Sequence, residues 1–368
     1  MSDTPVDVIR ALRDEDGPDI AALARICFPR IQACWVVPGP AGGMVVVADQ
    51  EVVAAALLRI IALPGRHRIG FIAWVMTHPD HRGRGLAGRL VAASTAALRQ
   101  QGCEAVVTDI EGYNTASVRT FVAAGYQRLS VGRQVLRWNP LGALWLWLSS
   151  YWAIDPGYFL WVDDAPSVIS RPWLNGLAAV LFNSAVALLA LSVGQGLFEP
   201  SWPSPSQAIG SVLGVGSLLL ARGLGMRLVA LVHRQALVYR PWWGGWGLSA
   251  LIAMLFGQVF PLPGGYYPPG DDWRVAEHRA MLGRGAMLSA GLMAGLLGLA
   301  ALARDGTGHA LLDDSVATLR FVGRPLLVFD TLLACTPFQG FNGRRLLEHH
   351  RLAWCLLALL AVAVVLWA

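Results

Sequence analysis

A series of long apolar runs in the second half of this chain constrains its fold more than any other feature. Each run reaches or approaches the roughly 20 residues that a helix needs to cross a bilayer. The runs cover residues 173–197, 208–231, 281–303, 322–338 and 352–368. They predict an all-α, multi-pass transmembrane domain over residues 173–368. A shorter run at 246–265 ends in prolines and glycines, so it is either a sixth span or a re-entrant segment.

Charge is distributed unevenly between the two halves. The chain is 55% hydrophobic and only 14% charged, whereas soluble proteins average about 25% charged residues. Residues 1–140 carry most of the interspersed acids and bases, which predicts a water-soluble domain there. Residues 141–172 are rich in aromatic side chains, which is typical of a linker at a membrane interface.

Arginines flank the apolar runs and predict the orientation of the chain. With five spans and one re-entrant segment, one side of the membrane holds Arg227, Arg234, Arg240, Arg274, Arg279, Arg344, Arg345 and Arg351. The positive-inside rule makes that side cytoplasmic. Residues 1–18 are polar and acidic rather than a signal peptide. We therefore expect a multi-pass protein of the inner membrane with its N-terminal domain in the cytoplasm, and no nucleic-acid partner.

The soluble half alternates between strand and helix patterns. Strands are expected at residues 6–12, 43–48, 51–61, 69–77 and 105–111, with a last strand pair at 126–138. Helices are expected at 16–26, from within 82–87 to 101, and at 115–124. This order predicts an α/β domain in which helices flank a mixed sheet.

The loop between residues 77 and 86 predicts an anion site. The strand "IGFIAWVMT" runs into "HPDHRGRGLAGRL", and Gly83 and Gly85 allow the backbone to turn sharply beside a ligand. The first amides of the following helix then point toward one spot, together with the positive end of the helix dipole. Such a site suits a pyrophosphate.

Two motifs in this half resemble those of the GNAT acetyltransferases. Arg82, Gly85 and Ala87 stand at the positions of the family signature R/Q-x-x-G-x-G/A, which binds coenzyme A. Thirty residues later, "NTASVRTFVAAGY" from Asn114 to Tyr126 resembles N-x-x-A-x-x-x-Y-x-x-x-G-F, the helix along the pantetheine arm. The resemblance covers residues 6–138 and implies a GNAT domain.

That resemblance implies acetyl-CoA, or another acyl-CoA, as the co-substrate. It assigns binding roles to Val75, Thr77, Arg82, Gly83, Arg84, Gly85, Leu86, Ala87, Asn114 and Phe121. The backbone of Val75 and Thr77 would pair with pantetheine, and the amides of residues 82–87 would hold the pyrophosphate.

The residues for proton transfer are less directly indicated. Phe121 stands where many relatives have the tyrosine that protonates the departing thiolate. Tyr113 and Tyr126 are candidates to replace it, or else they serve in packing. Asp109 and Glu111 point to one face of their strand, so they are candidates for the general base or form a surface carboxylate pair.

The membrane half resembles a degraded site-2-type intramembrane zinc protease over about residues 173–350. Its first metal motif, H-E-x-x-H, falls on Arg222 to Met226, and the aspartate of the second falls on Asn342. Zinc needs histidine, cysteine or carboxylate ligands, so neither metal binding nor proteolysis is expected. Asp330 lies inside an apolar run and marks either a functional site or an ion pair with an arginine of a neighbouring helix.

Together these features predict a membrane-tethered N-acyltransferase. It would transfer an acetyl group from acetyl-CoA to an amine acceptor that is lipophilic or part of a membrane protein. Two alternatives remain open: a sensor that binds acyl-CoA without turnover, and a scaffold whose inactive membrane domain holds a client protein.

Overall fold

The computed structural model describes residues 7–37, 42–65, 67–164, 172–195, 202–303, 308–334 and 340–367. Parts of the predicted spans at 173–197, 322–338 and 352–368 and of the second protease-like motif lie outside these ranges. The chain divides into two compact units. The first comprises residues 1–110, 114–152 and 159–169, and the second comprises 111–113, 153–158 and 170–368.

The first unit contains seven strands and the helices that cover them. Its strands are β1 (Val8–Ala11), β2 (Gly43–Ala48), β3 (Glu51–Leu63), β4 (His67–Thr77), β5 (Ala105–Glu111), β6 (Gln127–Arg128) and β7 (Tyr158–Val162), of which the ends of β5 and β7 are grouped with the second unit. Its helices are α1 (Gly17–Cys27), α2 (Arg30–Ala33), α3 (Leu86–Gln100), α4 (Thr115–Ala123) and α5 (Val131–Ser149), with short 3-10 turns η1 (Asp14–Asp16), η2 (Pro79–His81) and η3 (Trp152–Ile154).

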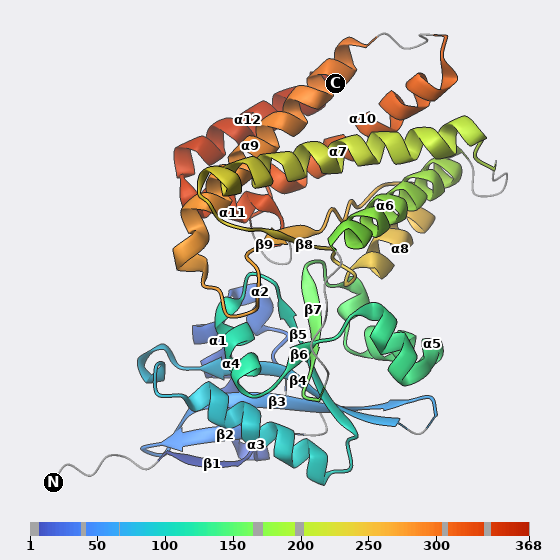
Figure 1. Cartoon of the computed structure of the whole chain (residues 1–368). Helices are drawn as coiled ribbons and strands as arrows, with labels where there is room; N and C mark the ends of the chain where they lie inside the picture. The colour runs from blue at the N-terminus through green and yellow to red at the C-terminus, as the bar shows by residue number, and fades with distance from the viewer. Residues whose placement is uncertain are drawn as a thin grey trace. The chain divides into compact units, whose positions relative to one another are not determined.

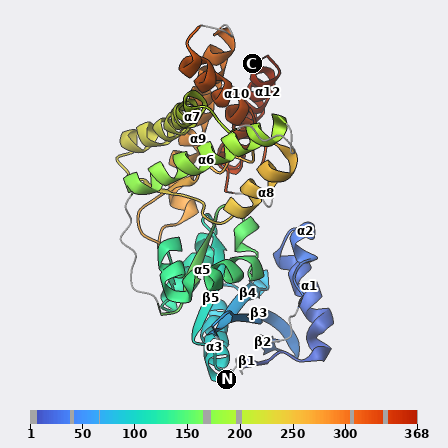
Figure 2. The same cartoon turned by 90° about the vertical axis from the view of Figure 1, so that its right-hand side faces the viewer.

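The strands form one mixed sheet in the order β1-β2-β3-β4-β5-β7-β6. Strands β1 to β4 pair antiparallel, β4 and β5 pair parallel, and β6 pairs antiparallel with β7. Helices α1 and α3 cover opposite faces, as Figure 2 shows. Alternation along β3 explains this, because Ala55 packs toward α1 and Ala54 and Ala56 pack toward α3. The predicted mixed sheet with flanking helices is confirmed.

The expected strand pair at 126–138 is wrong. Only Gln127 and Arg128 are extended, and they pair with Val162 and Trp161 of β7. Residues from Val131 onward form α5, in which Trp138 is fully buried. Apolar residues at 131, 135 and 138 follow a helical spacing, and the partner strand comes from residues 158–162, inside the predicted interfacial linker. The first unit therefore extends beyond residue 140.

Apart from the ends of β5 and β7, the regular elements described in the second unit are helices and one small ribbon. Its helices are α6 (Pro172–Gln195), α7 (Pro205–Val232), α8 (Trp246–Phe256), α9 (Val275–Leu302), α10 (Ala310–Thr331), α11 (Asn342–His349) and α12 (Arg351–Trp367). Two short strands, β8 (Val238–Arg240) and β9 (Gly265–Tyr267), pair antiparallel. Figure 1 shows α7 lying along α9 and α10.

Three helices are long and apolar enough to cross a membrane. Within the ranges that the structure describes, these are α6 over Trp173–Gly194, α7 over Pro205–Val232 and α9 over Val275–Leu302. Helix α12 has 17 residues and α8 has 11. Helix α8 lies in the short apolar run at 246–265, which we expected to be either a sixth span or a re-entrant segment. The helix ends before Gly257, which has a positive φ of 59°.

Small residues allow α7 to approach its neighbours closely. A Cβ atom added at Gly225 would lie 2.4 Å from the backbone nitrogen of Ser289 in α9, and one at Gly214 would lie 2.6 Å from the carbonyl oxygen of Ser315 in α10. The Ser289 hydroxyl donates to the Arg222 carbonyl at 2.7 Å. Close packing through glycine and serine is typical of helices that associate in a membrane.

A buried ion pair joins α7 to α10. Arg222 is 2% exposed and Asp330 is fully buried. The guanidinium Nε donates to Asp330 Oδ2 at 2.5 Å and Nη2 donates to Oδ1 at 3.2 Å, while Nη1 donates to the Gly264 carbonyl at 2.9 Å. Asn342 adds two hydrogen bonds to the same carboxylate, from its backbone nitrogen at 3.2 Å and from Nδ2 at 3.0 Å. Of the two alternatives for Asp330, the structure shows the ion pair.

Candidate functional site

The site begins where two parallel strands separate. The register of β4 with β5 covers only Ile69–Phe71 opposite Ala105–Val107. The hydroxyl of Thr108 then donates to the Ile72 carbonyl at 2.9 Å. Strand β4 continues from there to Thr77 beside β3, where it pairs with Ala54. The last residues of β4 are therefore held from one side by β3.

The loop after β4 delivers backbone amides to this place. Gly83 and Gly85 have φ values of 79° and 73°, which a residue with a side chain rarely adopts. Helix α3 begins at Leu86, and its N-cap Gly85 offers no side chain to bond the first turn. The first intrahelical donor is Arg89, which bonds Gly85 at 3.1 Å. The amides of residues 86–88 are thus available to an anion.

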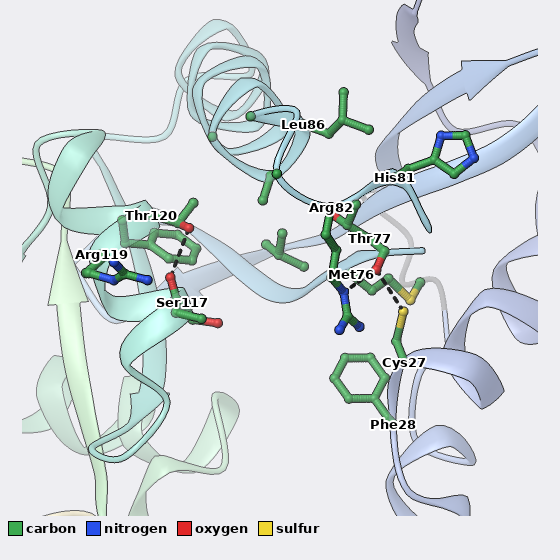
Figure 3. Close-up of a pocket in the computed structure, with 17 residues that line it drawn as sticks. Cys27, Phe28, Met76, Thr77, His81, Arg82, Leu86, Ser117, Arg119 and Thr120 are labelled. Atoms are coloured by element: carbon green, nitrogen blue, oxygen red, sulfur yellow. Dashed lines mark hydrogen bonds between the residues drawn. The ribbon is translucent and has the colours of Figure 1, made fainter. Parts of the chain in front are cut away.

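A pocket of about 480 Å³ opens at this loop. Its residues come from the end of β4, the glycine loop, the first turn of α3, α4 and the end of α1. They are Cys27, Phe28, Val75, Met76, Thr77, His81, Arg82, Gly83, Gly85, Leu86, Ala87, Gly88, Ala116, Ser117, Arg119, Thr120 and Phe121. Figure 3 shows Cys27, Phe28 and Arg82 on one side, facing Ser117, Arg119 and Thr120 of α4.

Thr77 organises one wall of the pocket. Its carbonyl accepts hydrogen bonds from Cys27 Sγ at 3.3 Å and from Arg82 Nε at 3.2 Å. Burial raises the pKa of the Cys27 thiol, so the thiol is protonated at neutral pH. The buried Thr77 hydroxyl has no hydrogen-bond partner within the described part of the chain. An unsatisfied hydroxyl at the end of β4 fits a ligand with its own polar groups.

The pocket is electropositive. Arg82 and Arg119 line it, and its described lining contains no aspartate or glutamate. Just outside it, Arg84 donates to Asp7 at 2.8 Å, and Arg89 contacts the same carboxylate at 3.5 Å. A glycine loop, free helix amides and arginines together fit the phosphates of a nucleotide-like ligand.

Most of the predicted binding residues meet in this pocket. Val75, Thr77, Arg82, Gly83, Gly85, Leu86, Ala87 and Phe121 all line it. Arg84 and Asn114 do not line it. Arg84 is turned toward Asp7 and His81, and Asn114 caps α4 by accepting a hydrogen bond from the Ser117 amide at 3.2 Å.

The four predicted catalytic residues lie elsewhere. Neither Asp109 nor Glu111 lines the pocket, and Glu111 is grouped with the second unit. Tyr126 is buried, and its hydroxyl shares a 2.7 Å hydrogen bond with Thr95 while its ring packs edge-on against Phe121. Tyr113 is also buried, with its ring 5.0 Å from the Arg345 guanidinium. Their roles in proton transfer stay predictions.

Glu111 has an unusual environment for a carboxylate. It is buried in the second unit, accepts the Tyr113 amide at 2.9 Å and lies 3.9 Å from Arg344. Burial outweighs these contacts and raises its pKa from 4.5 to about 7. Because the folded state holds the proton more tightly than the unfolded state, the associated stability is present below pH 4.5 and is lost as the pH rises through 7.

We therefore expect Glu111→Gln to be more stable than the parent at pH 8 but not at pH 4.5. The difference of pKa, from 4.5 to about 7, corresponds to at most about 3 kcal/mol. Glutamine keeps an oxygen for the Tyr113 amide, and Arg344 keeps Glu348 at 2.7 Å. Thermal unfolding of the full chain in detergent at both pH values checks this. Equal shifts at the two pH values would show that folding does not raise the pKa of Glu111.

Several pocket residues were not predicted from the sequence. Four of them lie inside the second motif: Ala116, Ser117, Arg119 and Thr120. Helical spacing within that motif could have indicated which positions face the pocket. Cys27 and Phe28 had no such signal. They reach the pocket because α1 packs against the sheet beside Met76, near the end of β4.

Comparisons with known proteins agree with this geometry. Residues 9–126 match the Acetyltransferase (GNAT) family. A mycothiol acetyltransferase from Sanguibacter keddieii is 39% identical over 70 residues, which are 19% of this chain and 22% of the relative. The chain thus spans about a fifth of that relative. The predicted GNAT resemblance is confirmed for residues 9–126, whereas the protease-like resemblance of the membrane half stays a prediction.

Two solved structures that match part of this chain are distant from it in sequence. N-acetylglutamate synthase from Neisseria gonorrhoeae, complexed with coenzyme A and N-acetyl-glutamate, is 19% identical with a TM-score of 0.29, over 43% of this chain and 35% of the synthase. The ribosomal-protein-S18-alanine N-acetyltransferase from Escherichia coli is 12% identical with a TM-score of 0.32, over 45% of this chain and 100% of that enzyme.

Proposed function

We propose that this chain is a membrane-anchored N-acetyltransferase that transfers an acetyl group from acetyl-CoA to an amine. One observation carries the proposal. The residues that match the GNAT family surround a pocket with a glycine loop, an uncapped helix start and arginines on two walls. A pocket with these features suits a diphosphate linked to a long polar arm.

The residues present fit coenzyme A in both charge and hydrogen bonding. The amides of residues 86–88 and the side chain of Arg82 would bind the pyrophosphate. The pantetheine arm would follow the end of β4, where Thr77 supplies a free hydroxyl. Ser117 and Thr120 of α4 form the opposite wall. The thioester would then lie between the sheet and α4.

In the reaction, the amine nitrogen attacks the thioester carbonyl carbon. A new C–N bond forms, the C–S bond breaks, and the electron pair leaves with the sulfur. The proton that the amine loses balances the proton that the thiolate gains. Holding the two reactants together supplies a large part of such a rate. The electropositive lining favours both an uncharged amine over an ammonium and a departing thiolate over a thiol.

Three long apolar helices support a membrane location. We infer a multi-pass arrangement in the inner membrane with five or six spans and the acetyltransferase domain in the cytoplasm, in agreement with the arginine distribution. The acceptor would then be an amine that is lipophilic or part of a membrane protein. The alternatives, an acyl-CoA sensor and a client-binding scaffold, gain no support from the comparisons.

Gly85→Glu is expected to abolish acetyl-CoA binding. A glutamate at this N-cap would place a carboxylate where the pyrophosphate would lie, and repulsion between the two negative groups should weaken binding about 100-fold or more. Titration calorimetry of acetyl-CoA into the purified full chain in detergent measures this. Release of free coenzyme A thiol in the presence of primary amines then tests turnover.

Gly102→Glu is the matched control. Gly102 also has a positive φ, of 82°, and lies at the far end of α3, where an added Cβ meets only the Arg68 side chain at 4.0 Å. The control carries the same backbone strain and the same new charge but should bind acetyl-CoA normally. If the folded parent does not bind acetyl-CoA, or if the two variants lose affinity equally, the proposed site is wrong.

A further inference from the structure

A second cavity lies in the helical unit, outside the acetyltransferase pocket. It has a volume of about 270 Å³ and runs between α6 and α7, with the β8–β9 ribbon at one end. Its walls are almost entirely apolar. Both helices are long and apolar enough to cross a membrane, so this groove would face the bilayer.

Missing side chains create the groove. Gly176 of α6 and Gly216 of α7 both line it. An added Cβ atom at Gly176 would meet nothing within 4 Å, and one at Gly216 would meet only Val180 Cγ1 at 3.9 Å. At Gly214 and Gly225 of α7, a neighbouring helix occupies the space that a side chain would take. Gly176 and Gly216 instead face open space. The groove is therefore a gap that the protein's own packing leaves unfilled.

The end of the groove at the β8–β9 ribbon is polar and charged. Arg227 lies over the ring of Tyr266, with its guanidinium 5.7 Å from the ring centre. Tyr239 lines the same end. Among the residues that the structure describes, no carboxylate lies within ion-pair distance of Arg227, so the ring face alone orients this cation. Its N–H donors are available to an anion.

We propose that this groove binds one acyl chain of an anionic phospholipid, with the lipid phosphate at Arg227. The apolar walls match a hydrocarbon chain, and the cation at one end matches the charge of the head group. The inference depends on the proposed membrane location but not on acetyl transfer.

Filling the groove should remove the lipid without disturbing the fold. Gly176→Leu and Gly216→Leu place a side chain in open space and replace glycine with a better helix former. The full chain is purified in detergent, mixed with dioleoyl-phosphatidylglycerol or dioleoyl-phosphatidylcholine, and examined by native mass spectrometry. We expect the parent to retain one phosphatidylglycerol in preference to phosphatidylcholine, and both leucine variants to lose it.

Arg227→Gln tests the head-group contact separately. Losing a charged donor should lower phosphatidylglycerol retention about tenfold and remove the preference over phosphatidylcholine. The matched controls are Gly291→Leu, at an open helical position on α9, and Arg279→Gln, an exposed arginine outside the groove. Both controls should retain the lipid as the parent does.

Three results would overturn the inference: no preferential phosphatidylglycerol retention by the parent, equal retention by the leucine variants, or retention of a co-purified peptide in place of the lipid. Acetyl-CoA affinity is measured on the same samples. If the parent binds acetyl-CoA but retains no lipid, the groove proposal alone is rejected. If the parent retains the lipid but does not bind acetyl-CoA, the acetyltransferase proposal alone is rejected.

Discussion

Asp330→Ala is expected to lower the free energy of unfolding of the helical unit by about 3–5 kcal/mol. The substitution leaves the buried guanidinium of Arg222 without its counter-ion. Of its hydrogen bonds to described residues, the one to the Gly264 carbonyl is kept. It also removes the acceptor for both nitrogens of Asn342. Leaving a charge unpaired in the interior costs far more than the pair itself contributes. Thermal unfolding of the full chain in detergent measures the loss.

Two further variants separate the charge from other effects. Arg222→Leu combined with Asp330→Leu removes both charges together, and it should be closer to the parent in stability than Asp330→Ala is. Asp314→Ala removes a partly exposed carboxylate from the same helix and should have little effect. If Asp330→Ala is as stable as the parent, then Arg222 and Asp330 do not form a coupled pair in the folded protein.

Gly225→Ala should destabilise the contact between α7 and α9. The new Cβ would lie 2.4 Å from the Ser289 nitrogen and 2.6 Å from its Cα. Backbone atoms cannot rotate aside, so the helices must separate, which typically costs about 1–3 kcal/mol. Separation would also stretch the hydrogen bond from Ser289 to the Arg222 carbonyl. The unfolding midpoint in detergent reports this loss.

Gly291→Ala is the control for helix propensity. An added Cβ at Gly291 of α9 would meet nothing within 4 Å, so alanine there should raise stability by up to about 1 kcal/mol. The two alanine variants are thus expected to shift stability in opposite directions. Shifts of the same sign would mean that α7 and α9 do not approach as closely as the structure shows.

Local sequence determined much of the N-terminal half. Short apolar runs identified β2 through β5. The glycines at 83 and 85, together with the apolar run after them, located the start of α3. Eight of the ten predicted binding residues line the pocket. The strand and helix predictions succeeded because each depends on a few residues that are adjacent in the chain, whereas the binding roles stay predictions.

Contacts between distant residues decided the rest. The sequence did not indicate that residues 158–162 would supply the partner of β6, because strand pairing depends on register with a remote segment. It did not place Cys27 beside Thr77, or Glu111 in the second unit, because both depend on how helices and strands pack.

Asp330 illustrates the division. Its presence in an apolar run indicated that it needed a partner, since an isolated charge is costly there. Only the packing of α7 against α10 selected Arg222 as the partner, 108 residues away in the chain. The sequence alone therefore determined which residues require a particular environment. The tertiary structure decided which residues provide it, because burial and pairing are set by chain segments that no local pattern relates.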